Sequence, residues 1–213
     1  MALRGRRMTY AATVLADSPA GYWPPNDASG TSANDLSGNG NAGTYSGLFA
    51  LAQAGLLPGS PDTCAKFTGG SDGSLRGSPR PRRSGVVVRG MVNLTSWAEY
   101  AGLVDDIGRT HSALLDAGAA NDVYFIGGGA TVAALAFPAT ITLSALHHIV
   151  FTCAGPSANC IAYLDGAGGT PQPRGAGVTH ANSWTICLRP GPFVHSRVGS
   201  LQRGNYVLGS GER

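Results

Sequence analysis

The sequence predicts an all-β protein, an antiparallel β-sandwich in which helix is confined to short turns. Glycine contributes 32 of the 213 residues and proline 13, while only 13% of residues are charged, which favours short strands joined by tight turns over a helical bundle. Three short apolar segments, 103–107, 112–116 and 122–126, recur at roughly ten-residue spacing, as the strands of a sandwich do. The length suits one domain, which we expect to span residues 9–213.

The N-terminal residues 1–8 are basic and predict a flexible arm. No long apolar stretch follows them, so we expect no secretory signal peptide there, and no apolar run in the chain is long enough to span a bilayer. Residues 10–16 should form a helical turn at most, which Pro19 ends. The formal net charge of +3 is small, so nucleic-acid binding is not implied.

The first part of the sheet is expected to begin at Tyr22-Trp23, with a second short strand at 44–46. The alanine-rich segment 48–57 predicts either a helical turn or a loop lying on the core. Residues 64–70 alternate in polarity and then reach two glycines, which indicates a strand entering a turn.

Residues 71–85 contain two prolines and four arginines and therefore predict an exposed loop. Arg80, Arg82 and Arg83 are candidate contacts for an anionic partner. The alternative is a solvated loop without a binding role.

Between the first two strands lies a loop rich in glycine and asparagine. Asp35, Asn39 and Asn41 carry hard oxygen donors of the kind that calcium prefers, so they form a candidate calcium site. The alternative is turn chemistry alone, because the same residues favour tight turns with positive φ.

Further strands are expected at 86–94, 131–136 and 140–143, followed by a hairpin from His147 to Asp165. His147 and His148 are adjacent on a strand and should point to opposite faces, so they cannot jointly ligate one metal. A turn at 155–158 would bring Cys153 and Cys160 opposite each other across the hairpin, either as a disulfide or as two buried thiols. No cysteine pair has the spacing of a structural zinc site.

Two separated stretches carry a resemblance to a known family. Residues 22–45, preceded by the lead-in 14–21, and the later segments 147–152 and 161–166 resemble the laminin G-like, concanavalin A-like jelly-roll domains. The resemblance implies a jelly-roll β-sandwich of the kind found in phage virion proteins and in secreted bacterial proteins. It fades in the segment 170–213, where the closing strand could be altered, supplied by a neighbouring subunit, or absent.

Three function classes are compatible with such a fold, and an enzyme is the least supported. A glycoside hydrolase needs two carboxylates on one face of a sheet. The chain has two glutamates, Glu99 and Glu212, and neither has an acidic residue two positions away. Asp105 and Asp106 are adjacent and would point to opposite faces of a strand, and no nucleophile or phosphate-loop motif is present.

The expected function is therefore that of a non-catalytic structural or adhesive virion protein, a phage capsid decoration or tail component. Its expected partners are other virion proteins and surface glycans, in a homo-oligomer located on the virion after release. This expectation rests on analogy between folds. The alternative is a secreted, lectin-like carbohydrate-binding module.

Overall fold

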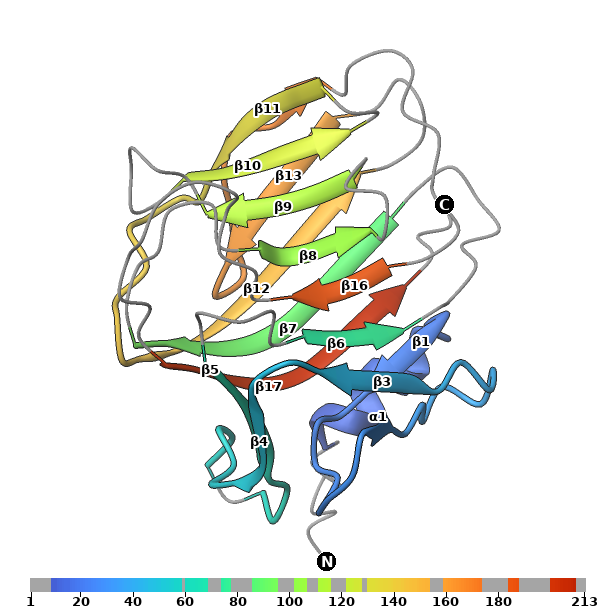
Figure 1. The fold of residues 1–213 in the computed structure, drawn as a ribbon. Coiled ribbons are helices and arrows are strands. Elements are labelled where there is room, and N and C mark those ends of the chain that lie inside the picture. Colours follow the sequence, from blue (N-terminus) through green and yellow to red (C-terminus); the bar gives the residue numbers. More distant parts are fainter. Residues whose placement is uncertain are drawn as a thin grey trace, which may run out of the picture.

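The protein is described by a computed structural model, and Figure 1 shows its two facing layers of strands. The described residues are 9–58, 60–68, 74–77, 86–95, 102–106, 111–115, 122–127, 130–153, 159–173, 184–187 and 200–209. Within these ranges the secondary structure consists of one short helix, α1 (Tyr10–Ala16), and strands that pair antiparallel throughout. The predicted antiparallel β-sandwich with little helix is confirmed. None of the described helical residues form a segment long and apolar enough to cross a membrane.

One layer is a nine-stranded sheet with the order β14-β13-β12-β7-β17-β5-β4, in which β1 also pairs with β17 and β15 with β13. Its strands are β1 (Gly21–Trp23), β4 (Phe49–Gln53), β5 (Cys64–Thr68), β7 (Val86–Leu94), β12 (Leu146–Cys153), β13 (Asn159–Leu164), β14 (Ala167–Gly168), β15 (Gln172–Pro173) and β17 (Ser200–Gly209).

The other layer is an eight-stranded sheet with the order β11-β10-β9-β8-β16-β6-β3-β2. Its strands are β2 (Ser32–Ala33), β3 (Gly43–Ser46), β6 (Ser74–Gly77), β8 (Gly102–Asp106), β9 (His111–Leu115), β10 (Asp122–Gly127), β11 (Ala130–Ala136) and β16 (Trp184–Cys187).

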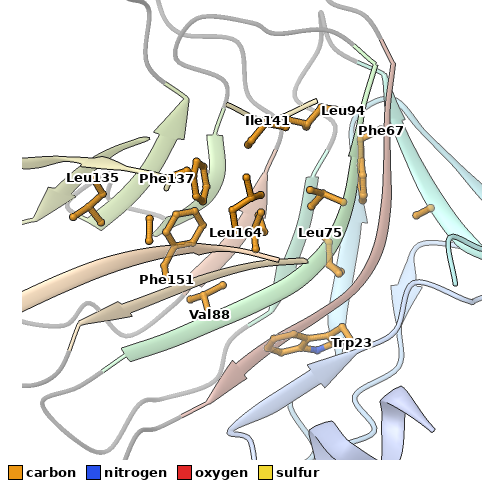
Figure 2. Packing of buried hydrophobic residues seen from close by; sticks show 14 of the residues in the cluster. Trp23, Phe67, Leu75, Val88, Leu94, Leu135, Phe137, Ile141, Phe151 and Leu164 are labelled. Carbon is orange, nitrogen blue, oxygen red and sulfur yellow. The ribbon is translucent and has the colours of Figure 1, made fainter. Parts of the chain in front are cut away.

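Alternating side chains of both sheets fill the space between them, because successive strand residues point to opposite faces. On β7, Val88, Val92 and Leu94 are buried in this core, and Leu75 of β6 meets them from the other sheet. Figure 2 shows the aromatic side chains Phe137 and Phe151 facing each other in the same cluster, with their ring centroids 5.8 Å apart.

Two sequence predictions near the core are corrected by the structure. The segment 48–57 contains the strand β4 instead of a helical turn or a loop, since Phe49 pairs with Phe67 of β5 and packs on the core. The predicted strand at 140–143 is not one, although Ile141 is buried. Pro138 follows the end of β11 and removes a backbone donor, and the chain crosses instead to a turn whose Ser144 N–H donates to Leu94 O at 2.7 Å.

The arginine- and proline-rich segment 71–85 is not a loop throughout. Strand β6 lies within it, paired with β3 on one side and β16 on the other, and its Leu75 and Gly77 are buried. The prediction of an exposed loop is therefore wrong for residues 74–77. Arg80, Arg82 and Arg83 lie outside the described residues.

The strand that closes the sandwich is present in the C-terminal segment. Strand β17 lies between β7 and β5 and pairs along most of β7, from Val87 to Leu94. Of the three alternatives for the segment 170–213, closure by the chain itself is the one observed. In Figure 1 this red strand runs beside β7, with β5 and β4 continuing the sheet on its other side.

The β12–β13 hairpin has the register that the sequence predicts, with Cys153 directly opposite Cys160. Cys160 is buried and disulfide-bonded, and a disulfide with Cys153 remains a prediction. Cys64 is free and buried, and its thiol lies 3.1 Å from Ala54 O. Burial raises the pKa of that thiol, so it behaves as a small core side chain.

Candidate functional site

The candidate site is the loop of residues 26–42, here called the polar loop, which joins β1 to β3 and includes β2. Apart from Leu36, its side chains are small or polar, and most of them are exposed. Two carboxylates inside the loop, Asp27 and Asp35, accept hydrogen bonds from its neighbours. They hold it against the rest of the sandwich.

Asp35 accepts four hydrogen bonds through its two carboxylate oxygens. Oδ1 accepts the backbone N–H groups of Tyr22 and Ser37, both at 2.9 Å. Oδ2 accepts the Ser37 hydroxyl at 2.8 Å and the Asn41 N–H at 2.9 Å. Burial raises the pKa of the Asp35 carboxyl, but these hydrogen bonds outweigh burial and hold the pKa below its usual value. The charged carboxylate therefore ties the loop at Ser37 and Asn41 to Tyr22 of β1.

Asn39 and Asn41 fasten the same loop to the segment before β1. The Asn39 side-chain amide donates to Pro19 O at 2.9 Å, and that of Asn41 donates to Ala20 O at 2.7 Å. Gly38 and Gly40 have φ values of 84° and 71°, which glycine adopts without the steric cost that other residues would incur. The dense glycine and asparagine pattern thus serves a closed turn.

The structure places the three predicted calcium ligands in one turn. Their side chains form hydrogen bonds there with the protein's own backbone and hydroxyl groups. The two asparagines offer N–H donors to carbonyl oxygens, and both oxygens of Asp35 already accept two donors each. Among the described residues, no group of three or more His, Cys, Asp or Glu side chains could hold a metal ion. Calcium binding by Asp35, Asn39 and Asn41 remains a prediction.

A melting experiment tests the calcium prediction directly. If calcium binds here, a chelator should lower the melting temperature of the protein, because a ligand that binds only the folded state stabilises it. Asp35→Ala should abolish that response. A melting temperature that is indifferent to both calcium and chelator would reduce the loop to turn chemistry.

Asp27 connects the polar loop to the core. Its Oδ1 accepts the Asn34 side-chain amide at 2.6 Å, and its Oδ2 accepts the Tyr45 hydroxyl at 2.9 Å. The Tyr45 ring is buried and stacks on Phe49, with 5.3 Å between centroids. Burial, followed by the hydrogen bond and the charge of Asp27, raises the pKa of the Tyr45 phenol, so it stays a neutral donor.

The outward side of the polar loop presents uncharged polar groups on a backbone held at several points. Its exposed polar side chains outside the Asp35 turn are Asn26, Ser29, Thr31, Ser32 and Asn34. Hydroxyl and amide groups of this kind can donate to and accept from polyhydroxyl ligands. Chemically, the arrangement suits binding rather than proton transfer.

The two histidines on β12 lie on opposite faces, as predicted. His147 is buried, with Nδ1 2.7 Å from Asp165 Oδ2 and Nε2 3.1 Å from Thr142 O. His148 is half-buried on the other face, and its backbone N–H donates to Asp165 Oδ1 at 2.8 Å. Asp165 therefore fastens the turn after β13 to the start of β12, which is a structural role.

Sequence reasoning missed the contribution of several other polar residues. Asp27 has the same chemical type as Asp35 but lacks the dense turn pattern around it, and nothing local marks it as a partner of Tyr45. Asp165 entered the sequence prediction only as the last residue of the hairpin, and its φ of 51° suits the turn that follows. Arg89, which forms an ion pair with Asp17 at 2.6 Å, has no sequence signal because the two residues are 72 positions apart.

Comparison with known proteins finds similarity at the level of the fold. No family model matches the chain, and no curated protein matches its sequence. Among solved structures, one of botulinum neurotoxin type C, whose cell entry depends on two ganglioside molecules, superposes with a TM-score of 0.70 at 10% identity and covers 95% of this chain. The binding domain of botulinum neurotoxin serotype C1 gives 0.69 at 11% identity over 93%.

A mutant sialidase of Trypanosoma rangeli with trans-sialidase activity superposes with a TM-score of 0.57 at 16% identity, over 89% of this chain. The chain spans about half of the neurotoxin structures (50%) and 30% of the sialidase. At such low identity these similarities establish the fold alone. The chain is an antiparallel β-sandwich of the concanavalin A-like jelly-roll type.

Proposed function

We propose that the protein is a non-catalytic recognition module that binds glycans through the polar loop. The observation that carries this proposal is the loop itself, an exposed surface of hydroxyl and amide groups fixed by Asp27 and Asp35. A binding surface that is rigid before binding loses less conformational entropy when its ligand arrives. Sugars present many hydroxyl groups, which such a surface can match.

The roles of the described carboxylates support a function without catalysis. Each aspartate whose side chain is described accepts a hydrogen bond or forms an ion pair within the fold: Asp17, Asp27, Asp35, Asp62 and Asp165. A glycosidase needs a carboxylic acid and a carboxylate on either side of the scissile bond. Side chains committed to holding turns together are poorly suited to that chemistry.

The fold comparisons support the choice of ligand class. The neurotoxin whose cell entry involves gangliosides shares this sandwich, and its binding domain has the same architecture over most of the present chain. This support is an analogy between folds. It suggests a class of ligand, glycans, and does not identify an individual glycan.

We further propose that the module is displayed on a phage particle, as a capsid decoration or tail component. There it forms a homo-oligomer, and this oligomer binds other virion proteins. The resemblance of residues 22–45 to such domains motivates this location. The disulfide at Cys160 is consistent with an oxidising environment outside the cytosol, where disulfides persist. Mass spectrometry of purified particles should detect the chain, and its absence from capsids and tails would leave a secreted module.

A glycan array tests the recognition function. The wild-type protein should bind a subset of the immobilised glycans. The double variant Ser29→Ala, Thr31→Ala should weaken binding to that subset about tenfold or more, since two neutral hydrogen bonds each contribute about 1 kcal/mol. The matched control is Thr140→Ala, an exposed threonine outside the polar loop, which should bind as the wild type does.

Three results would contradict this function. Absence of binding to every glycan would remove the ligand class, and equal weakening by Thr140→Ala would remove the loop as the site. Release of sugar from any bound glycan would show catalysis and overturn the non-catalytic assignment.

A further inference from the structure

The N-terminal helix α1 lies on the outer face of the nine-stranded sheet. On β7, Val88 and Val92 point into the core, so Arg89 between them points to the opposite face. The Arg89 guanidinium donates to Val14 O at the end of α1 at 3.3 Å and pairs with Asp17 just beyond it at 2.6 Å. We call residues 9–18, which contain α1, the strap.

The strap adds little to the main core. Val14 and Tyr22 form a buried cluster of their own, distinct from the large cluster between the sheets, with Tyr10 and Ala11 packed around it. Segments with few buried apolar contacts open at lower free energy than the global unfolding of a protein. The strap can therefore detach while the sandwich stays folded.

Polar atoms in the contact between the strap and the sheet lack a hydrogen-bond partner among the described residues. The Tyr10 ring meets the His148 ring edge to face, with 6.3 Å between centroids. The hydroxyl oxygens of Tyr10 and Tyr22 and Nε2 of His148 are buried without a hydrogen-bond partner among the described residues. Leaving a buried polar atom unpaired destabilises a contact by about 1–3 kcal/mol, and more when the group is charged.

We propose that the strap is an acid-released device, in which protonation of His148 drives α1 away from the outer face of the sheet. An imidazolium at this position would place a second cation near Arg89, with its Nε2–H buried and without an acceptor among the described groups. Detachment of α1 would return that N–H to water. It would also uncover Tyr22 and His148, while Asn39 and Asn41 keep Pro19 and Ala20 in place.

The groups around His148 set the direction of the pH response. Arg89 faces it from β7, Tyr10 from α1, and Asp165 from the turn after β13, while Asp17 on the strap neutralises part of the Arg89 charge. The Asp165 carboxylate already accepts the backbone N–H of His148 and contacts the His147 ring. Tyr22 from β1 is neutral, because burial raises the pKa of its phenol, as do the nearby Tyr10 and Asp62.

Burial, followed by the positive charge of Arg89, lowers the pKa of His148 below its usual value near 6.5, and the Asp165 charge opposes this only in part. A group whose pKa is depressed in the docked state binds its proton more readily in the released state. The docked strap is therefore fully stable above about pH 6.5 and loses stability as the pH falls through the lowered pKa. The pKa of Asp165 is also lowered: burial raises it, but hydrogen bonds and the nearby histidines outweigh burial, so Asp165 stays charged through this window.

Hydrogen exchange measures strap release in the intact chain. The reporters are the amides of Thr13, Asp17 and Ser18, which donate to Thr9, Val14 and Leu15 carbonyls within the strap. After correction for the intrinsic pH dependence of exchange, their protection in the wild type should fall between pH 7.5 and pH 5. The fall should approach about tenfold per pH unit between the released-state pKa near 6.5 and the lowered docked-state pKa, which is the limit for one proton, and it should level off below the lowered pKa. The amides of β13 serve as the internal reference and should keep their protection.

His148→Gln should abolish this fall, since glutamine does not titrate, and Asp17→Asn should weaken protection at every pH while the fall remains. If His148→Gln does not fold, His148→Asn serves instead. An equal loss in wild type and the histidine variant, or protection that is unchanged at pH 5, would overturn the proposal. A simultaneous loss in β13 would do the same, because it would show unfolding of the whole sandwich.

Discussion

Asp35→Ala should lower the free energy of unfolding by about 2–4 kcal/mol, because it leaves several backbone donors of the polar loop unpaired. The backbone N–H groups of Tyr22, Ser37 and Asn41 all lose their acceptor. Water can reach part of this turn, since Asp35 is itself only half-buried, which keeps the loss below the sum of three fully buried groups. Urea unfolding of the variant and the wild type measures the difference.

Asp62→Ala is the matched control for this prediction. Among the described residues the Asp62 carboxylate accepts one hydrogen bond, from the Ser60 hydroxyl, whereas Asp35 accepts four. It should cost about 1 kcal/mol or less. The stabilising effect of Asp35 should be present above the usual carboxyl pKa near 3.8 and disappear as the pH falls through its lowered folded-state pKa. The two unfolding curves should therefore converge in acid. A loss of stability no larger than that of the control would refute the central role of Asp35.

Trp23→Ala should cost about 3–5 kcal/mol, the range for a fully buried large aromatic side chain. Trp23 is 0% exposed, and its indole N–H donates to Asn41 O at 2.7 Å, so the ring also holds the polar loop. It extends from β1 in one sheet to β6 in the other, where Gly77 leaves room for it. An ideal Cβ on Gly77 would lie 2.4 Å from Cζ2 of the indole, closer than real contacts allow.

A double-mutant cycle tests this packing argument. Gly77→Ala alone should destabilise by about 1–3 kcal/mol through overpacking against the ring. In the Trp23→Ala background the same substitution should be close to neutral, because the obstructing ring is gone. Thr140→Ala, an exposed control, should leave the unfolding midpoint unchanged. Additive effects of the two core substitutions would mean that Trp23 and Gly77 do not contact each other as described.

Local patterns predicted the parts of the fold whose partners are close in the sequence. The β12–β13 hairpin formed with the expected pairing of Cys153 and Cys160, because a short turn leaves few alternative registers. The alternation of polarity placed His147 and His148 on opposite faces for the same reason. The positive φ values at Gly38 and Gly40 follow from a turn sequence that glycine alone accommodates without strain.

The candidate site was predicted in position but not in chemistry. Asp35, Asn39 and Asn41 meet as expected, yet the groups that satisfy them include the Tyr22 amide and the carbonyls of Pro19 and Ala20, between 13 and 21 residues away. Which backbone groups face a loop depends on how β1 is placed against it. That placement is a tertiary property, so local sequence could indicate oxygen donors without indicating what they bind.

The sequence by itself determined where the chain turns and which side chains alternate, and thereby the class of the fold. Only the tertiary structure decided that a strand lies within the arginine-rich segment 71–85, that β17 closes the sheet, and that Arg89 holds Asp17 from 72 residues away. A short strand is stabilised by packing against neighbouring strands that are distant in the sequence. The same segment forms a strand where those neighbours are present and stays an exposed loop where they are absent. For β6 the neighbours are β3 and β16, and burial of Leu75 between the sheets outweighs the loop-forming tendency of the prolines around it.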